Sequence, residues 1–182
     1  MTITETSNIR QLPLSIRTNK EVIQDALNSG CIRAKVILTK TIVLGHWVKL
    51  QCQYGCPFYG KLYTCPPHTP TSDEMADILL DYHKALLILT GQDSHLLNLV
   101  VGLEEKFKSK GFYKAFALCS HPCDLCEVCT LDTQCKFPEK TRPTVQACGI
   151  DMQGTVLKNG WGDLSPIHPC ATDCNIGLVL LD

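Results

Sequence analysis

Four cysteines lie within a stretch of thirteen residues, at the spacing C-x2-C-x2-C-x5-C: Cys123, Cys126, Cys129 and Cys135. Thiolates bind iron and zinc, and two consecutive C-x2-C steps bring successive sulfurs onto one concave loop. The spacing is close to the ferredoxin run C-x2-C-x2-C-x3-C, which holds corners of an iron–sulfur cubane. The pattern therefore favours a [4Fe–4S] cluster as the first hypothesis.

Zinc is the main alternative for these thiols, because four thiolates also form a common structural zinc site. Zinc ribbons usually use two C-x2-C knuckles that are roughly a dozen or more residues apart, so that two hairpins approach the ion from opposite sides. The middle thiols here are too close together in the sequence to form two separate knuckles. Zinc binding is the second interpretation, and reactive or disulfide-bonded thiols are the third.

A second cysteine-rich stretch lies between residues 51 and 70. Its thiols, Cys52, Cys56 and Cys65, follow the spacing C-x3-C-x8-C. Proline follows Cys56 and Cys65 directly, which removes a backbone donor and fixes the direction in which the chain leaves the thiol. Aromatic side chains alternate with the thiols and would shield a cluster from solvent. The alternative interpretation is a turn, rich in glycine and proline, that these aromatic side chains pack.

Composition places limits on the class of protein. The chain has 182 residues, enough for one domain with a sizeable core, and we expect a single domain over residues 1–182. Its 17 Lys and Arg balance 18 Asp and Glu, so no overall field favours nucleic acid or an anionic membrane. Residues 1–10 are polar and no run of about 18 apolar residues occurs, so we expect neither export nor a membrane span. Twelve cysteines in a cytoplasmic protein are more often ligands than disulfides.

The segments that must position the thiols are indicated by hydrophobic periodicity. We expect helices over residues 19–30, 73–82 and 95–110 and from 142 toward 157, and strands within 35–50, 84–90, 112–118 and 176–181. The order strand, helix, strand over residues 84–118 is typical of a parallel sheet, whose sites collect at the carboxyl ends of strands. The expected fold is α/β, a mostly parallel sheet flanked by helices, with the cysteine-rich loops at one end.

Several motifs together resemble a known family, domain of unknown function 2284, which is described as predicted metal-binding proteins. The resemblance runs from roughly residue 45 to the C-terminus, and it is carried by Cys52-Gln-Tyr-Gly-Cys56, Cys65-Pro-Pro67, Pro122-Cys-Asp-Leu-Cys126 and Ala147-Cys-Gly-Ile-Asp151. It implies metal binding, with iron–sulfur as the natural candidate, and supplies no reaction. It points to the seven thiols above and to Cys148, whereas the other cysteines depart from its pattern: Cys31, Cys119, Cys170 and Cys174.

Counting ligands leaves the number of clusters open. A [4Fe–4S] cluster takes four thiolates, so three plus four thiols and Cys148 would hold two clusters. Either Cys135 or Cys148 would then complete the set formed by the residues near Cys52. Without Cys148, one cluster has three protein thiolates and an open iron, which would suit an enzyme rather than an electron carrier.

No P-loop, G-x-G-x-x-G, H-E-x-x-H or G-x-S-x-G motif is present. We therefore expect one or two [4Fe–4S] clusters that serve in electron transfer with a redox partner protein. Lys136, Lys140 and Arg142 would form a small basic patch for an acidic partner. An enzyme with an open iron site and a zinc-stabilised interaction module are the alternatives.

Overall fold

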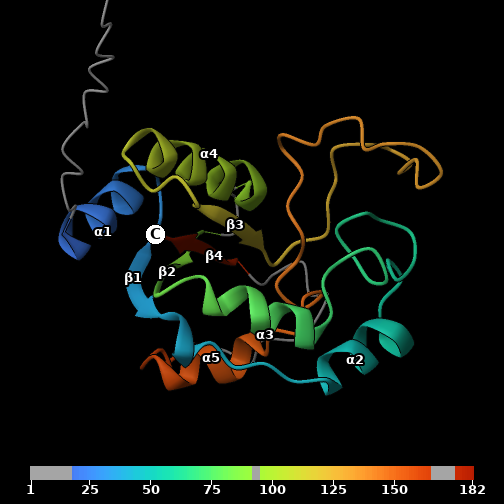
Figure 1. Ribbon diagram of the computed structural model, residues 1–182, viewed down its shortest axis with the longest axis horizontal. Coiled ribbons are helices and arrows are strands. Elements are labelled where there is room, and N and C mark those ends of the chain that lie inside the picture. Colours follow the sequence, from blue (N-terminus) through green and yellow to red (C-terminus); the bar gives the residue numbers. More distant parts are fainter. Residues whose placement is uncertain (1–17, 92–94, 165–174) are drawn as a thin grey trace, which may run out of the picture.

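The structure is a computed structural model that describes residues 18–91, 95–164 and 175–182. None of the helices in these ranges combines the length and the apolar character needed to cross a membrane. The elements follow one another in this order (Figure 1): α1 (Asn19–Asn28), β1 (Arg33–Leu38), the short 3-10 helix η1 (Thr39–Thr41), α2 (Trp47–Gly55), α3 (Ser72–Leu80), β2 (Lys84–Leu89), α4 (Leu96–Ser109), β3 (Phe116–Cys119), α5 (Met152–Lys158) and β4 (Ile176–Leu181).

The four strands form one sheet in the order β1-β2-β4-β3, and every neighbouring pair is antiparallel. The expected mostly parallel sheet is therefore wrong. Since β2 and β3 both pair antiparallel with β4, they run in the same direction, and α4 connects them. The strand, helix, strand pattern is thus a crossover between parallel strands, but the last strand of the chain lies between them.

Helices cover both faces of this sheet (Figure 1). One core cluster joins the sheet to α1 and α4, and the other joins it to α3 and α5. Side chains alternate between the two clusters along each strand, as they must in a pleated strand: Leu86 belongs to the α4 side and Leu87 to the α5 side. β4 is buried at every position, which explains why it reads as a continuous apolar run.

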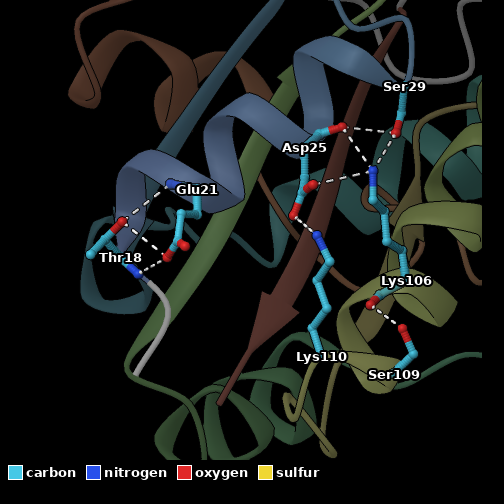
Figure 2. Close-up of polar contacts among 7 residues, drawn as sticks. All are labelled: Thr18, Glu21, Asp25, Ser29, Lys106, Ser109 and Lys110. Atoms are coloured by element: carbon cyan, nitrogen blue, oxygen red, sulfur yellow. Dashed lines mark hydrogen bonds and ion pairs between the residues drawn. The ribbon is translucent and has the colours of Figure 1, made fainter. Parts of the chain in front are cut away.

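Capping boxes stabilise the starts of α1 and α3, and ion pairs join α1 to α4. Thr18 and Glu21 form a reciprocal capping box at the start of α1, as Thr71 and Glu74 do at the start of α3. Figure 2 shows the Asp25 carboxylate of α1 between two lysine side chains from the end of α4. Lys106 Nζ lies 3.3 Å from Asp25 Oδ1, and Lys110 bonds to the other carboxylate oxygen.

Three stretches differ from the sequence-based expectation, and in the first of them the strand expected at 112–118 begins only at Phe116, as β3. The strand expected within 35–50 ends at Leu38, and α2 begins at Trp47 because Val48 and Cys52 are buried one helical turn apart. The helix expected from residue 142 begins only at Met152. Asp151 is its N-cap, since its carboxylate accepts a hydrogen bond from the Gly154 amide at 2.9 Å. The helices over 73–82 and 95–110 and the strands at 84–90 and 176–181 are confirmed to within two residues at each end.

Two long connections, residues 56–71 and 120–143, contain neither helix nor strand. Figure 1 shows both on the side of the sheet away from α1. These connections carry most of the cysteines that the sequence singles out.

Candidate metal centre

The four thiols of the second cysteine-rich stretch line one small cavity of about 20 Å³, which we call the four-thiol pocket. Its remaining walls come from both long connections and are mainly apolar or hydroxyl-bearing: Leu62, Tyr63, Thr64, Leu125, Phe137 and Thr141. The lining thiols, Cys123, Cys126, Cys129 and Cys135, are half-buried. The Sγ of Cys135 lies 3.2 Å from the hydroxyl oxygen of Thr141.

The three thiols of the first stretch line a second cavity of about 10 Å³, which we call the three-thiol pocket. Cys52 projects from α2, Cys56 follows that helix directly, and Cys65 comes from the connection beyond it. The other walls combine aromatic and proline side chains with three polar residues: Phe58, Tyr59, Pro66, Pro122, Ser120, Thr144 and Gln146. The sequence-predicted thiols are therefore grouped as three and four, with Cys148 in neither group.

Hydrogen bonds between the two long connections hold the two pockets side by side. The Cys123 amide donates to the Thr64 hydroxyl at 3.4 Å, across 59 positions in the sequence. The Thr64 carbonyl accepts from the Thr144 amide at 3.0 Å, and the Tyr63 hydroxyl donates to the Leu131 carbonyl at 3.1 Å. The residue next to Thr64 is Cys65, which is close enough to Cys123 for their charges to interact. Thr64 and Cys65 thus lie where the two pockets meet.

Burial governs the protonation of the thiols. It raises the pKa of Cys65 to about 11, with a further increase from neighbouring thiols, and it raises the pKa values of Cys52 and Cys123. These groups are therefore thiols at neutral pH in the metal-free protein. A metal that binds them must displace their protons, so binding releases protons to solvent.

Cys56 is in a disulfide bond in this structure. A sulfur atom in a disulfide is not a thiolate and does not bind a metal as one. Metal binding by Cys56 therefore requires that this disulfide be reduced first.

The four thiols of the four-thiol pocket are the right donor set for a metal group, but they do not converge on one point in this structure. Within residues 18–91, 95–164 and 175–182, no three His, Cys, Asp or Glu side chains are close enough together to hold a metal ion. The sulfurs must therefore come closer together when a metal binds. Most of them lie on segments without helix or strand, so this movement breaks no strand pairing. Four thiolates are a complete set for a cubane or for zinc.

Cys148 lies in the hydrophobic core and lines neither pocket. Its side chain is fully buried with residues such as Met152 and Val156, and burial raises its pKa to about 12. The structure does not bring it together with the other predicted ligands. Cys31 and Cys119 are buried in the core cluster on the α4 side, and Cys170 and Cys174 lie outside the described residues.

Arg142 is part of a buried ion pair rather than of a surface patch. Its Nε and Nη2 atoms donate to the two Glu104 oxygens at 2.6 and 2.7 Å, and its Nη1 donates to the Thr141 carbonyl at 2.7 Å. The Ala117 backbone amide also donates to Glu104 Oε2 at 2.7 Å, and Lys108 Nζ donates to Oε1 at 2.5 Å. This pair fastens the end of the cysteine-rich connection to α4 and β3. Lys136 and Lys140 are exposed and remain as the basic side chains near Cys135.

The sequence did not single out Gln146, which the structure places in the wall of the three-thiol pocket. Its side chain is 4% exposed, and its Nε2 donor is buried without a hydrogen-bond partner. No spacing or motif marks this residue, because a single glutamine has no pattern of its own. Gln146 can be recognised only from its position beside Cys52, Cys56 and Cys65 in the folded protein.

Comparison with known proteins supports metal binding. The chain matches no curated protein and no solved structure. A family described as "Predicted metal-binding protein (DUF2284)" matches residues 35–168, which include both pockets and all of their thiols. Since this match covers more than half of the chain, the protein belongs to the DUF2284 family of predicted metal-binding proteins.

Proposed function

We propose that the four-thiol pocket holds a [4Fe–4S] cluster and that the protein transfers electrons. The observation that carries this proposal is the grouping of Cys123, Cys126, Cys129 and Cys135, from a single connection, around one cavity. Their consecutive C-x2-C spacing suits a cubane better than the paired knuckles of zinc ribbons. The cluster, when bound, supplies one-electron redox chemistry.

The protein's own residues would hold and shield this cluster. Four cysteine ligands leave no iron free for a substrate, which suits electron transfer rather than catalysis. Leu62, Leu125 and Phe137 would exclude water from one side, which tunes the reduction potential of such clusters. The half-buried thiols keep the cluster near the surface, where electrons reach a partner.

A redox partner protein would dock over this connection. Val128 is 76% exposed between two of the thiols, and Lys136 and Lys140 are exposed nearby. An apolar contact surrounded by lysines fits a partner with an acidic surface. We place this exchange in the cytoplasm, where the thiols would remain reduced.

The second candidate function is a zinc-stabilised interaction module. The small volume of the four-thiol pocket, about 20 Å³, favours this reading, since a single ion needs less space than a cubane. A four-thiolate zinc site is closed and structural, so such a protein would have no redox activity.

The test is the metal content of cysteine variants purified without oxygen. Cys126→Ala removes a ligand of the four-thiol pocket, and we expect it to lower iron and acid-labile sulfide by about four each per chain. Cys31→Ala is the matched control, because Cys31 is a buried thiol in the core on the α4 side. Unchanged iron in Cys126→Ala, or zinc without sulfide in the wild type, would contradict the proposal.

A further inference from the structure

The three-thiol pocket brings one disulfide sulfur together with two free thiols. Cys56 is disulfide-bonded, whereas Cys52 and Cys65 are free and line the same cavity. Since the other described cysteines are all free, Cys56 is bonded to neither of these two. A thiol that lies beside a disulfide can displace one of its sulfurs, which replaces one disulfide by another without net oxidation. The pocket therefore contains the groups that thiol–disulfide exchange requires.

The three sulfurs differ in their access to solvent. Cys52 is 3% exposed and Cys65 is 5% exposed, so a molecule from solvent does not reach either thiol directly. Cys56 is half-buried, and both of its neighbours in the chain, Gly55 and Pro57, are exposed. An external thiol would therefore attack Cys56 first, and a buried thiol would act second.

The end of α2 places Cys52 and Cys56 at a separation that a disulfide can span. Cys52 lies in α2 and Cys56 is the C-cap of this helix, and the Cys56 amide donates a hydrogen bond to the Cys52 carbonyl at 3.3 Å. Four residues of α-helix rise roughly 6 Å, and a disulfide joins Cα atoms that are about 4.4–6.8 Å apart. This spacing selects Cys52, rather than Cys65 from the following connection, as the thiol that attacks Cys56.

We propose that Cys52 and Cys56 form a thiol–disulfide exchange centre that reacts with small thiols such as glutathione. Cys56 is the sulfur that meets the external thiol, and Cys52 is the thiol that displaces it. Disulfides of cytoplasmic proteins are usually transient and belong to catalytic or redox-sensing sites, which fits the compartment proposed above. The exchange needs no metal, so it is an activity separate from the proposed electron transfer.

The exchange proceeds in two steps that conserve electrons. In the first, the external thiolate bonds to Cys56 Sγ, the existing disulfide breaks, and its other sulfur leaves and takes up a proton. In the second, Cys52 Sγ gives up its proton and bonds to Cys56 Sγ, and the external thiol leaves with a proton. The protein then carries a Cys52–Cys56 disulfide. Because the external thiol is regenerated, no oxidant or reductant is consumed.

Gln146 would stabilise the charge that exchange places on sulfur. Negative charge develops on the attacking and leaving sulfurs, and a buried sulfur lacks the water that would stabilise this charge. Gln146 is 4% exposed in the wall of the pocket, and its Nε2 donor is buried without a hydrogen-bond partner. A donor that is already in place where charge develops lowers the barrier. Gln146 therefore speeds exchange without forming any of the bonds itself.

The test starts from the full chain with the Cys56 disulfide intact and with metal removed by a chelator. Glutathione is added, alkylation of the free thiols stops the reaction, and peptide mass spectrometry locates each disulfide. We expect the wild type to form a Cys52–Cys56 disulfide and to retain little glutathione. In Cys52→Ser, glutathione on Cys56 should rise roughly tenfold or more, because the neighbouring thiol that displaces it is gone. Cys31→Ser, which replaces a buried free thiol in the core cluster on the α4 side, is the matched control and should behave as the wild type does.

A second measurement examines Gln146. Gln146→Leu removes the unpartnered donor and should slow the appearance of the Cys52–Cys56 disulfide roughly tenfold or more, without changing its final amount. Gln53→Leu, at an exposed position beside Cys52 on α2, is the control and should react at the wild-type rate. Because Gln146 Nε2 has no partner, Gln146→Leu should unfold at the same urea concentration as the wild type or at a higher one. A lower concentration, or an unchanged rate of exchange, would contradict the role of Gln146.

The exchange centre itself is overturned if glutathione leaves the Cys56 disulfide unchanged, or if the wild type retains as much glutathione on Cys56 as Cys52→Ser does. Accumulation of glutathione in Cys65→Ser but not in Cys52→Ser would overturn the assignment of Cys52. If Cys52→Ser does not fold, the presence or absence of the Cys52–Cys56 disulfide in the wild type decides the proposal. None of these outcomes changes the case for a cluster in the four-thiol pocket, which has its own thiols.

Discussion

The backbone amide of Cys123 donates a hydrogen bond to the hydroxyl of Thr64, 3.4 Å away and 59 positions earlier in the chain. This contact joins the two cysteine-rich connections at a buried point, since Thr64 is 1% exposed. Thr64 precedes Cys65 in the three-thiol pocket, and Cys123 begins the four-thiol pocket. The two cysteine-rich pockets are therefore neighbours, and the Thr64 hydroxyl links the two connections that form them.

Loss of the Thr64 hydroxyl should destabilise this junction. Thr64→Val keeps the shape of the side chain but leaves the Cys123 amide without its acceptor, so we expect a loss of about 1 kcal/mol in the free energy of unfolding. Urea unfolding of the metal-free protein measures this loss. Thr133→Val, at an exposed position in the connection that carries Cys123, is the control and should have little effect. Equal stability of the two variants would show that the Cys123 contact contributes nothing.

The buried pair of Glu104 and Arg142 should be among the most sensitive positions in the fold. Glu104→Gln removes the charge that Arg142 faces and leaves a buried guanidinium unpaired, which costs roughly 3–5 kcal/mol. Glu105→Gln, one residue further along α4 and exposed, should change stability by less than about 0.5 kcal/mol. Chemical unfolding of both variants provides the comparison, and similar values for the two would contradict the importance of the pair.

The contact between α1 and α4 should weaken in acid. Burial alone would raise the pKa of Asp25, but hydrogen bonds and ion pairs with Lys110 and Lys106 outweigh it and lower the pKa below its usual value. A lowered carboxyl pKa stabilises the fold above the pKa of the unfolded chain, and this contribution disappears as the pH falls through the lowered folded-state pKa.

Asp25→Asn tests this dependence on pH. We expect it to lose about 1 kcal/mol relative to the wild type at pH 7, and this difference should shrink as the pH is lowered toward 3. Urea unfolding at several pH values measures the difference. Asp77→Asn, at an exposed position on α3, should show no comparable change. A constant difference between wild type and Asp25→Asn at all pH values would contradict the role of the carboxylate charge.

Substitution of Cys148 tests whether this residue is part of the core rather than a metal ligand. Cys148→Ala removes a fully buried sulfur and should cost about 1 kcal/mol of stability, because it leaves a small cavity. Iron and sulfide should stay at the wild-type values, since Cys148 lines neither pocket. Metal analysis beside thermal unfolding measures both effects. A loss of iron in this variant would show that Cys148 is a ligand.

Most of the local elements were predictable from the sequence, although α2 was expected as a strand, but the pairing of the strands was not. The apolar run at residues 176–181 identifies β4 because burial on both faces leaves a continuous hydrophobic pattern. Its position between β2 and β3 depends on contacts with residues such as Leu87 and Leu118, which are far away in the sequence. No local period records such long-range pairing, so the sheet was expected to be mostly parallel.

The candidate site was likewise predictable only in part. Thiol spacing predicted both cysteine groups, because short spacings constrain which sulfurs can share a loop. It did not predict that Cys148 packs in the core, since a count of thiols carries no information on which way a side chain points. Gln146 was missed for a related reason: its place beside the thiols depends on a cavity that forms only when distant segments fold together.

The most direct test of a redox-active cluster in this protein is a redox titration of protein purified without oxygen, with iron, zinc and acid-labile sulfide determined on the same sample. We expect iron and sulfide in equal amounts, at least about four of each per chain, and a visible absorption that bleaches reversibly on reduction. Zinc without sulfide, or iron whose spectrum does not respond to reduction, would contradict it.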